Sequence, residues 1–312
     1  MSAIKRCGTF LRSNTIVPIF LAVFVGCSIL IGGFFSGNNF INILNQVAAK
    51  CVLATGMTFL IINGHFDLSV GTLMGMTSCL LVGLMPNIGV FASIVLVLAI
   101  GVAAGLLNGF LVMKCGINTF IVTLVTMMIF RALGFIYTDT SIGGKVESFF
   151  EFGRVKFLGL TTLVWIAILL LAVGFLILSL TRHGRNTYAV GGNQSAAINM
   201  GINAARTTIL NFMICSVCAV IAGIMYASKL NSASPTLGYP DAHMIAISSV
   251  VLGGTKLAGG YGNMAYTAIG VVTLGIIDNA MNLLGLSSYY NTLVSGIILI
   301  AVLYLDKIIK RD

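Results

Sequence analysis

The chain has 312 residues, of which 58% are hydrophobic and 8% are charged, whereas roughly 25% of the residues in a soluble domain are charged. This composition excludes an ordinary soluble domain, and apolar runs of the ~20 residues that cross a ~30 Å hydrocarbon core indicate a polytopic membrane protein. The net charge of +9 does not indicate a nucleic-acid partner, because the cytoplasmic loops of membrane proteins carry an excess of Lys and Arg.

Apolar runs separated by polar breaks predict an all-α bundle of about ten transmembrane helices in a lipid bilayer, forming a single domain over residues 1–312. The eighth run is short and ends at glycine, so it is either a complete span or a broken half-helix. The expected spans are residues 15–35, 43–62, 68–85, 88–113, 117–137, 161–181, 207–228, 243–255, 262–284 and 290–306.

The distribution of basic residues predicts the orientation of these spans, with both termini in the cytoplasm. A re-entrant eighth segment would move the basic C-terminus outside, so the positive-inside rule disfavours it. Residues 138–160 then form an extracytoplasmic loop, and residues 182–206 form a cytoplasmic one. The cytoplasmic side holds Lys5, Arg6, Arg12, Lys114, Arg182, Arg185, Arg206, Lys256, Lys307, Lys310 and Arg311, against Lys145, Arg154, Lys156 and Lys229 outside.

Sequence motifs of enzymes and of nucleotide or metal sites are absent. The chain has no GxxxxGK[ST] phosphate loop, no HExxH and no GxSxG, and its three histidines show no metal-ligand spacing. Cys215 and Cys218 form a CxxC inside an apolar run, where it is typical of helix packing. We therefore expect no chemistry on a substrate, and no catalytic, metal-binding or cofactor-binding residue in this chain.

A polar break between the second and third spans, GHFDLSVG at residues 64–71, places His65, Asp67 and Ser69 near membrane depth. Polar groups are costly in lipid, so those that are present face a cavity or another helix. Asp67 either caps the following helix, because its carboxylate can accept hydrogen bonds from first-turn N–H groups, or lines a permeation path or gate with its neighbours. The two roles are compatible.

Two further groups of polar residues lie inside predicted spans. Arg131 lies deep in the fifth span, where a guanidinium must pair or extend to the interface. A structural ion pair or carbonyl contact is favoured there over contact with a solute. Asp278, Asn279 and Asn282 lie in the ninth span, with the two asparagines on one face. These three residues form either a pore face or interhelical hydrogen bonds.

The segment VGGNQSAAINMGI at residues 190–202 is a polar interruption on the predicted cytoplasmic side. Asn193 stands at an N-cap position and Gly201 stands where a C-cap glycine is favoured, which predicts a helix of about two turns between them. So short a helix is unstable alone in water. We expect it to dock onto a partner; the alternative is a simple solvated turn.

The same segment resembles the coupling motif of ATP-binding-cassette importer permeases. SAAINMG at residues 195–201 is similar to EAA-x3-G, with Ser in place of Glu, and AVGGNQSAAINMGIN resembles the corresponding loop of the monosaccharide permeases of the ribose, xylose and galactose type. His65, where that family has Gly, and Asp278, where Asn is common, depart from the pattern and leave the solute open. Four further stretches resemble the family in order: GHFDLSVGTLMGM, TLVTMMIFRALGF, ISSVVLGGTKLAGGYGNMAYTAIG and NLLGLSSYYNTLVSGIILIAVLYLD.

The resemblance implies a type II-like permease subunit in a bacterial cytoplasmic membrane. Such a subunit pairs with a second permease subunit, identical or different, and receives a pentose or hexose from an extracytoplasmic sugar-binding protein. It binds cytoplasmic ATPase subunits, which hold ATP and Mg²⁺, through residues that the resemblance places at Gly191, Gly192, Asn193, Ala196, Ala197 and Gly201.

Other solutes and other functions stay open at this stage. Related permeases carry branched-chain amino acids, nucleosides or furanosyl signalling molecules. An ATP-independent secondary carrier or facilitator is the main alternative function, and a membrane-embedded receptor or structural subunit without transport is the third.

Overall fold

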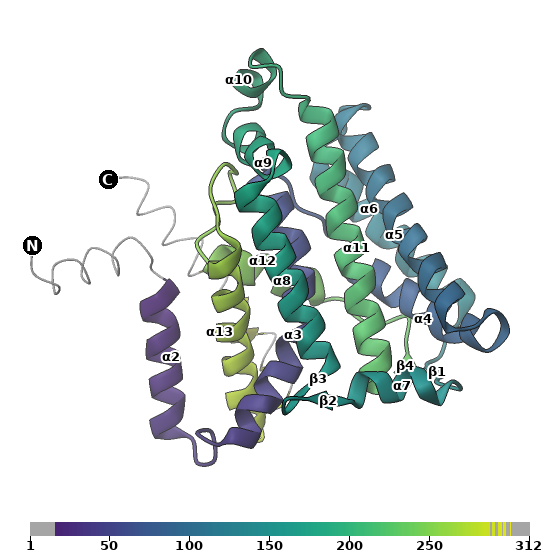
Figure 1. Cartoon of the computed structure of the whole chain (residues 1–312), viewed down its shortest axis with the longest axis vertical. Coiled ribbons are helices and arrows are strands. Elements are labelled where there is room, and N and C mark those ends of the chain that lie inside the picture. Colours follow the sequence, from purple (N-terminus) through teal and green to yellow (C-terminus); the bar gives the residue numbers. More distant parts are fainter. Residues whose placement is uncertain (1–15, 288, 291–292, 295, 298–299, 301–312) are drawn as a thin grey trace, which may run out of the picture.

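The computed structural model describes residues 16–287 together with residues 289–290, 293–294, 296–297 and 300. Within these residues the chain forms twelve helices and four two-residue strands, which confirms the expected all-helical bundle (Figure 1). The longer helices are α2 (Ile16–Leu30), α3 (Gly37–Ile62), α4 (Val70–Ile88), α5 (Val90–Met113), α6 (Thr119–Tyr137), α8 (Thr162–Leu180), α11 (Ala204–Leu230) and α13 (Met264–Leu283). The shorter ones are α7 (Glu147–Arg154), α9 (Arg182–Gly192), α10 (Gln194–Asn199) and α12 (Ala242–Leu252).

Seven helices of the described chain are long and apolar enough to cross a membrane, namely α3, α4, α5, α6, α8, α11 and α13. Helices α2 and α12 are apolar but shorter. Each of the first nine expected spans therefore coincides with a helix, whereas most of the tenth, residues 290–306, lies outside the described residues. The described part of the chain thus supplies seven full-length spans and not the expected ten.

Side-chain caps explain where several helices begin. Ser36 accepts a hydrogen bond from the Asn39 amide, and α3 accordingly begins at Gly37, ahead of the expected start of the second span at residue 43. Such a cap satisfies an N–H group that the first helical turn leaves without an intrahelical partner. The same kind of cap begins α6, α11 and α13, from Asn118, Asn203 and Asn263.

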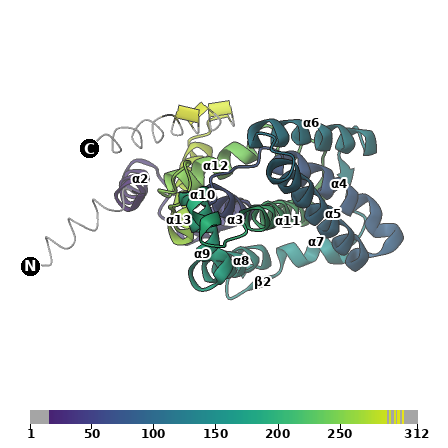
Figure 2. The ribbon, with the colours of Figure 1, turned by 90° about the horizontal axis from the view of Figure 1, so that it is seen from above.

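Helix α11 runs through the centre of the bundle between α3 and α5, as seen from the end that carries α10 (Figure 2). Gly101, Gly105 and Gly109 of α5 face it. A methyl group at Gly105 would lie 2.5 Å from the Cα atom of Met213, so the two backbones are in direct contact. Small residues permit this close approach in membranes, where lipid provides little hydrophobic drive for helix association.

The connections between helices gather at two ends of the bundle, which we call the α10 end and the α7 end (Figure 1). The α10 end carries α9 and α10, which join α8 to α11. The α7 end carries α7 and two antiparallel strand pairs. The expected loops at residues 182–206 and 138–160 therefore lie at opposite ends. The strands are β1 (Ile142–Gly143) paired with β4 (Ser232–Ala233), and β2 (Lys156–Phe157) paired with β3 (Leu160–Thr161).

Helix α12 is a half-helix that begins inside the bundle. Its 11 residues extend about 16 Å at ~1.5 Å per residue, roughly half of a ~30 Å hydrocarbon core. Residues 234–241 return from β4 into the bundle as turns, and Gly75 of α4 permits their approach, because a methyl group there would lie 2.7 Å from the Leu237 carbonyl oxygen. Non-helical backbone is tolerated at membrane depth where protein encloses it or where it lines a cavity.

Candidate coupling surface and intramembrane cavity

The segment of α9 and α10 at the α10 end, which we call the coupling segment, has both of the helix caps that the sequence predicts around α10. The Asn193 side chain accepts a hydrogen bond from the Ala196 amide at 2.9 Å. Gly201 has a φ of +81°, the left-handed conformation that favours glycine after a helix end. The Ile202 amide then donates back to the Ala197 carbonyl at 3.0 Å. Helix α10 is therefore a fixed six-residue helix and not a simple solvated turn.

The side chain of Ala197 packs inside its own subunit, and its predicted contact with an ATPase stays a prediction. It is 4% exposed and packs in a small apolar cluster with Val190 of α9 and Ala204 of α11. A buried methyl group at this position holds α10 against the two flanking helices. The residues predicted for the same contact that are exposed in the structure are Gly192, Asn193, Ala196 and Gly201.

Gly191 marks a close approach of α9 to two other segments, and its predicted contact with an ATPase stays a prediction. A methyl group there would overlap the carbonyl oxygen of Ile62 and would lie 2.9 Å from the amide nitrogen of Gly260. The Gly260 amide donates to that same carbonyl at 2.8 Å. One turn earlier, the Tyr188 hydroxyl donates to the Gly262 carbonyl at 2.8 Å. Helix α9 is therefore joined to the end of α3 and to the loop between α12 and α13.

Two exposed apolar side chains in the coupling segment were not predicted from the sequence. Ile198 is 52% exposed and Met200 is 83% exposed, and both follow the buried Ala197. Methionine and other large apolar residues are enriched where proteins contact one another. The signal was present in the sequence as two large apolar residues within an otherwise polar and small-residue segment.

Asp67 and Ser69 form a closed hydrogen-bond network with Asn108 of α5. One carboxylate oxygen of Asp67 accepts from the Ser69 amide at 2.8 Å and from the Ser69 hydroxyl at 2.6 Å, and the other accepts from the Asn108 side-chain amide at 3.2 Å. All three residues are fully buried, and burial raises the pKa of Asp67 although these donors oppose the shift. The network attaches the α3–α4 loop to α5, and a place for these residues on the solute path stays a prediction.

His65 lies apart from that network, half-buried at the α10 end. Its Nδ1 atom lies 2.7 Å from the Thr119 hydroxyl, and it shares a pocket of about 530 Å³ with Gln194 at the start of α10. Burial lowers the pKa of His65, because a low-dielectric environment disfavours the charged imidazolium. The residue therefore adjoins the coupling segment and is separate from the interior of the bundle.

The polar residues of α13 attach this helix to α3. Asp278 forms an ion pair with Lys50 at 2.5 Å, and Asn279 exchanges two amide hydrogen bonds of 3.0 Å with Asn39. Asn282 is exposed near the end of the helix. Interhelical bonding thus accounts for Asp278 and Asn279, while a pore position stays a prediction for Asn282. The sequence analysis did not identify Lys50 as a functional residue. The signal was Asp278, because a carboxylate inside a membrane span needs a partner of opposite charge.

The contact that the structure gives to Arg131 is aromatic, and it differs from the ion pair or carbonyl contact favoured by the sequence. The guanidinium carbon lies 3.9 Å from the centroid of the Tyr239 ring and 5.9 Å from that of Phe135. Such a cation–π contact stabilises by about 0.5–2 kcal/mol. The Arg131 side chain is exposed on α6, six residues or about 9 Å from the helix end at Tyr137.

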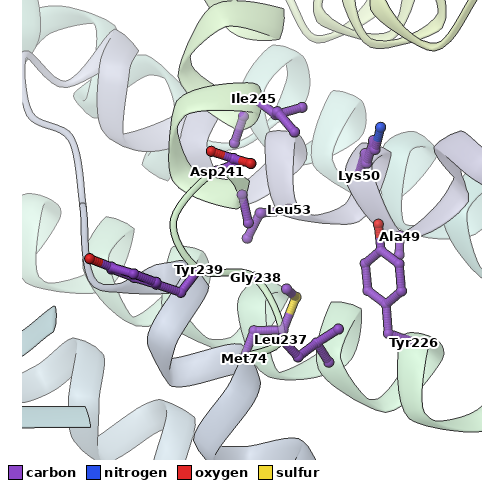
Figure 3. Close-up of a pocket in the computed structure, with 12 residues that line it drawn as sticks. Ala49, Lys50, Leu53, Met74, Tyr226, Leu237, Gly238, Tyr239, Asp241 and Ile245 are labelled. Atoms are coloured by element: carbon purple, nitrogen blue, oxygen red, sulfur yellow. The ribbon is translucent and has the colours of Figure 1, made fainter. Parts of the chain in front are cut away.

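A cavity of about 230 Å³ lies between α3, α4, α11 and the start of α12 (Figure 3). Figure 3 shows Lys50 and Tyr226 on one side of the cavity, with Asp241 on the other. Lys50 stands 12 residues before Ile62, or about 18 Å from the α10 end of its helix, so the cavity is at membrane depth. The cavity is lined by Lys50, the ion-pair partner of Asp278, and by none of the residues predicted for the solute path.

Comparison with known proteins places these features in a family. The family profile described as "Branched-chain amino acid transport system / permease component" matches residues 39–303. The chain is 37% identical over 305 residues to the ribose import permease protein RbsC of Bacillus subtilis (strain 168), covering 96% of this chain and 94% of that protein. It is 37% identical over 303 residues to the L-arabinose transport system permease protein AraH of Escherichia coli (strain K12), covering 93% and 88%.

A third relative is the D-allose transport system permease protein AlsC of Escherichia coli (strain K12), which is 32% identical over 284 residues, covering 89% of this chain and 86% of that protein. No solved structure matches the chain. The relatives are transporter subunits and not enzymes. Since the profile covers most of the chain and the relatives cover nearly all of it, the chain belongs to this family of bacterial transport-system permeases.

Proposed function

We propose that the chain is the membrane-spanning permease subunit of an ATP-binding-cassette importer and that it moves a small neutral sugar, a pentose or hexose, into the cell. The relatives are named for ribose, L-arabinose and D-allose, which are neutral monosaccharides. An uncharged solute also suits the membrane-spanning helices. They carry few charged side chains, and two of those, Lys50 and Asp278, neutralise each other.

In this proposal the α10 end faces the cytoplasm and the α7 end faces outside, in a bacterial cytoplasmic membrane. Ten segments enter or cross the bilayer, both termini are cytoplasmic, and residues 1–312 form one permease domain. The positive-inside rule supports this orientation, because the connections at the α10 end carry Lys114, Arg182, Arg185, Arg206 and Lys256.

The two ends of the bundle bind different partners in this proposal. A second permease subunit, identical or different, pairs with this one in the bilayer. A sugar-binding protein delivers the solute at the α7 end, and two ATPase subunits carrying ATP and Mg²⁺ bind at the α10 end. The permease itself binds no cofactor in this scheme.

The observation that carries the proposal is the exposed surface of α10 and its connections to the rest of the bundle. Ile198 and Met200 offer apolar contacts to an ATPase, and Ala197 holds α10 to α9 and α11. Helix α9 is bonded through Tyr188 to the loop after α12, and that loop is bonded in turn to the end of α3. A displacement of α10 therefore reaches the two helices that wall the cavity, and ATP binding biases the bundle between two packings.

The proposal is tested by changing the exposed apolar surface of α10 in the complete transporter. The chain carrying Met200→Glu is expressed with its cassette ATPase and binding protein, purified from membranes, and assayed for bound ATPase and for ATP-driven sugar uptake in proteoliposomes. We expect both to be lost, because a carboxylate in an apolar contact is desolvated without a partner.

The matched control is Leu158→Glu, which changes a side chain of similar exposure, 78% against 83%, at the α7 end. This variant retains the ATPase. Unchanged ATPase binding and uptake in the Met200→Glu protein would contradict the coupling role. Sugar uptake by the wild-type chain that needs no ATPase, or that depends on the proton gradient, would favour a secondary carrier instead.

A further inference from the structure

The cavity beside the half-helix α12 combines apolar walls with polar groups that are not fully used by the protein. Leu53, Met74 and Ile245 supply apolar wall. The Tyr226 hydroxyl makes no hydrogen bond to any residue in the part of the chain that the structure describes. Lys50 has three N–H donors, of which Asp278 accepts one. The non-helical residues 237–241 add backbone N–H and C=O groups to the wall.

This combination matches the chemistry of a monosaccharide. A sugar ring presents hydroxyl groups that both donate and accept hydrogen bonds, together with C–H faces that pack on apolar and aromatic side chains. The volume of about 230 Å³ lies just below the ~300–1,000 Å³ of sites for drug-sized ligands. It therefore suits a single small ring. Asp278 neutralises Lys50, and the Asp241 carboxylate also lines the wall, so the wall combines hydrogen-bond donors with acceptors, as a polyhydroxylated ring requires.

Arg131 and Tyr239 indicate how such a solute reaches the cavity. Tyr239 lines the cavity, and the exposed guanidinium of Arg131 lies 3.9 Å from the centroid of its ring. A guanidinium is costly against hydrocarbon, so the exposed Arg131 side chain either extends to the interface, about 9 Å away along α6, or faces a water-filled path or another protein subunit. The cavity therefore borders a face of the molecule that carries a charged group, because Tyr239 both lines the cavity and contacts Arg131.

We propose that this cavity is a transient sugar-binding site inside the membrane, with the Tyr226 hydroxyl and the Lys50 ammonium as hydrogen-bond donors and with Tyr239 at its entrance. The inference rests on the proposed importer function and adds to it the residues that contact the solute during translocation. Tyr226, Lys50 and Tyr239 become specificity-determining residues, because each meets a particular part of the sugar.

The test pairs removal of one protein hydroxyl with removal of sugar hydroxyls. The complete transporter is reconstituted with wild-type chain or with Tyr226→Phe, and ATP-driven uptake is measured at saturating concentrations of the sugar that the wild type accumulates among ribose, arabinose and allose. The same assay is run with the deoxy analogues of that sugar. Tyr261→Phe is the control, because Tyr261 is 54% exposed and lies outside the cavity.

We expect the wild type to prefer the parent sugar over one deoxy analogue by about 2- to 10-fold, the value of one neutral hydrogen bond. That preference disappears in Tyr226→Phe and persists in Tyr261→Phe. A second variant, Ala242→Phe, fills the cavity from the start of α12 and is expected to lower uptake at least 10-fold while the ATPase remains bound.

Three results separate the possible failures. If the wild type accumulates neither these three sugars nor any other pentose or hexose, the proposed importer function fails and not the cavity alone. An equal decrease for every sugar and analogue in Tyr226→Phe assigns the hydroxyl a purely structural role and overturns the inference. Unaltered uptake and an unaltered preference for the parent sugar in Tyr226→Phe overturn the inference as well. If Ala242→Phe does not reach the membrane, the Tyr226→Phe result by itself determines whether the inference holds.

Discussion

Two adjacent glycines at the end of α9 allow a sharp test of how the coupling segment is attached to the bundle. Gly191→Ala places a methyl group onto the Ile62 carbonyl oxygen and 2.9 Å from the Gly260 nitrogen. Ordinary contact begins near ~3.5 Å, so the loop at Gly260 must move away and its 2.8 Å hydrogen bond to Ile62 is lost. Gly192→Ala adds the same methyl group 3.8 Å from the Gly260 Cα atom, an ordinary contact.

The difference between these two variants isolates the close approach. Both gain about 1 kcal/mol from replacing glycine by alanine in a helix. Gly191→Ala also meets an overpacking cost of about 1–3 kcal/mol and loses a hydrogen bond of about 0.5–1.5 kcal/mol. We therefore expect Gly191→Ala to be less stable than Gly192→Ala by about 2–4 kcal/mol. Unfolding of each purified variant in a denaturing-detergent titration measures this difference.

The same pair separates attachment from docking. In proteoliposomes we expect Gly191→Ala to hydrolyse ATP with little sugar uptake, because α9 is detached from α3 and from the α12–α13 loop. Gly192→Ala retains uptake close to wild type. Equal stability and equal uptake in the two variants would refute the argument that α9 transmits force through these backbone contacts.

Three further variants test the packing and the buried polar groups. Gly105→Leu forces α5 and α11 apart and is expected to reduce the yield of folded protein more than about 10-fold. In the control Gly116→Leu, a Cβ atom meets nothing within 4 Å, so this variant is destabilised only by its positive φ. A similar decrease in the yield of both variants would contradict close packing at Gly105. Asp67→Ala removes the acceptor of the Ser69 amide and hydroxyl and leaves Asn108 bonded only to the Ser69 hydroxyl, which is expected to cost about 3–5 kcal/mol. A free energy of unfolding within about 1 kcal/mol of wild type would contradict this expectation. Lowered pKa values of His65 and His183 keep both rings neutral in the folded state, so stability is full above the unfolded pKa of ~6.5 and falls as the pH drops through the folded values. Thermal unfolding of wild type and His65→Gln from pH 7.5 to pH 5 measures this, and an identical acid-induced loss in both would exclude His65 as a source.

Long apolar runs were sufficient to predict the bundle. The helices lie within a few residues of the expected spans, and the Asn193 and Gly201 caps were predicted because capping depends on local residue types. Contacts between distant segments were not accessible in this way. Lys50 and Asp278 are separated by 228 residues, and no local pattern in either apolar run indicates that the two residues pair.

The orientation of single side chains was the other limit. Ala197 belongs to a motif that suggested a docking role, yet a six-residue helix is too short for an apolar period to indicate which face is buried. The path of residues 234–241 back into the bundle was also not predicted. It depends on Gly75 of α4, whose missing side chain admits the chain, and small residues in apolar runs are common to all the spans.

The ion pair between Lys50 and Asp278 has a consequence for biosynthesis. Ribosomes deliver α3 to the bilayer long before α13, and an ammonium at the centre of a helix costs about 2.5–3.5 kcal/mol on insertion. During that interval Lys50 lacks the carboxylate of Asp278, so we expect nascent α3 to stay close to water or to neighbouring protein until α13 emerges. We expect polypeptides truncated ahead of α13 to keep this uncompensated charge and to be less stable in the bilayer than chains completed as far as α13.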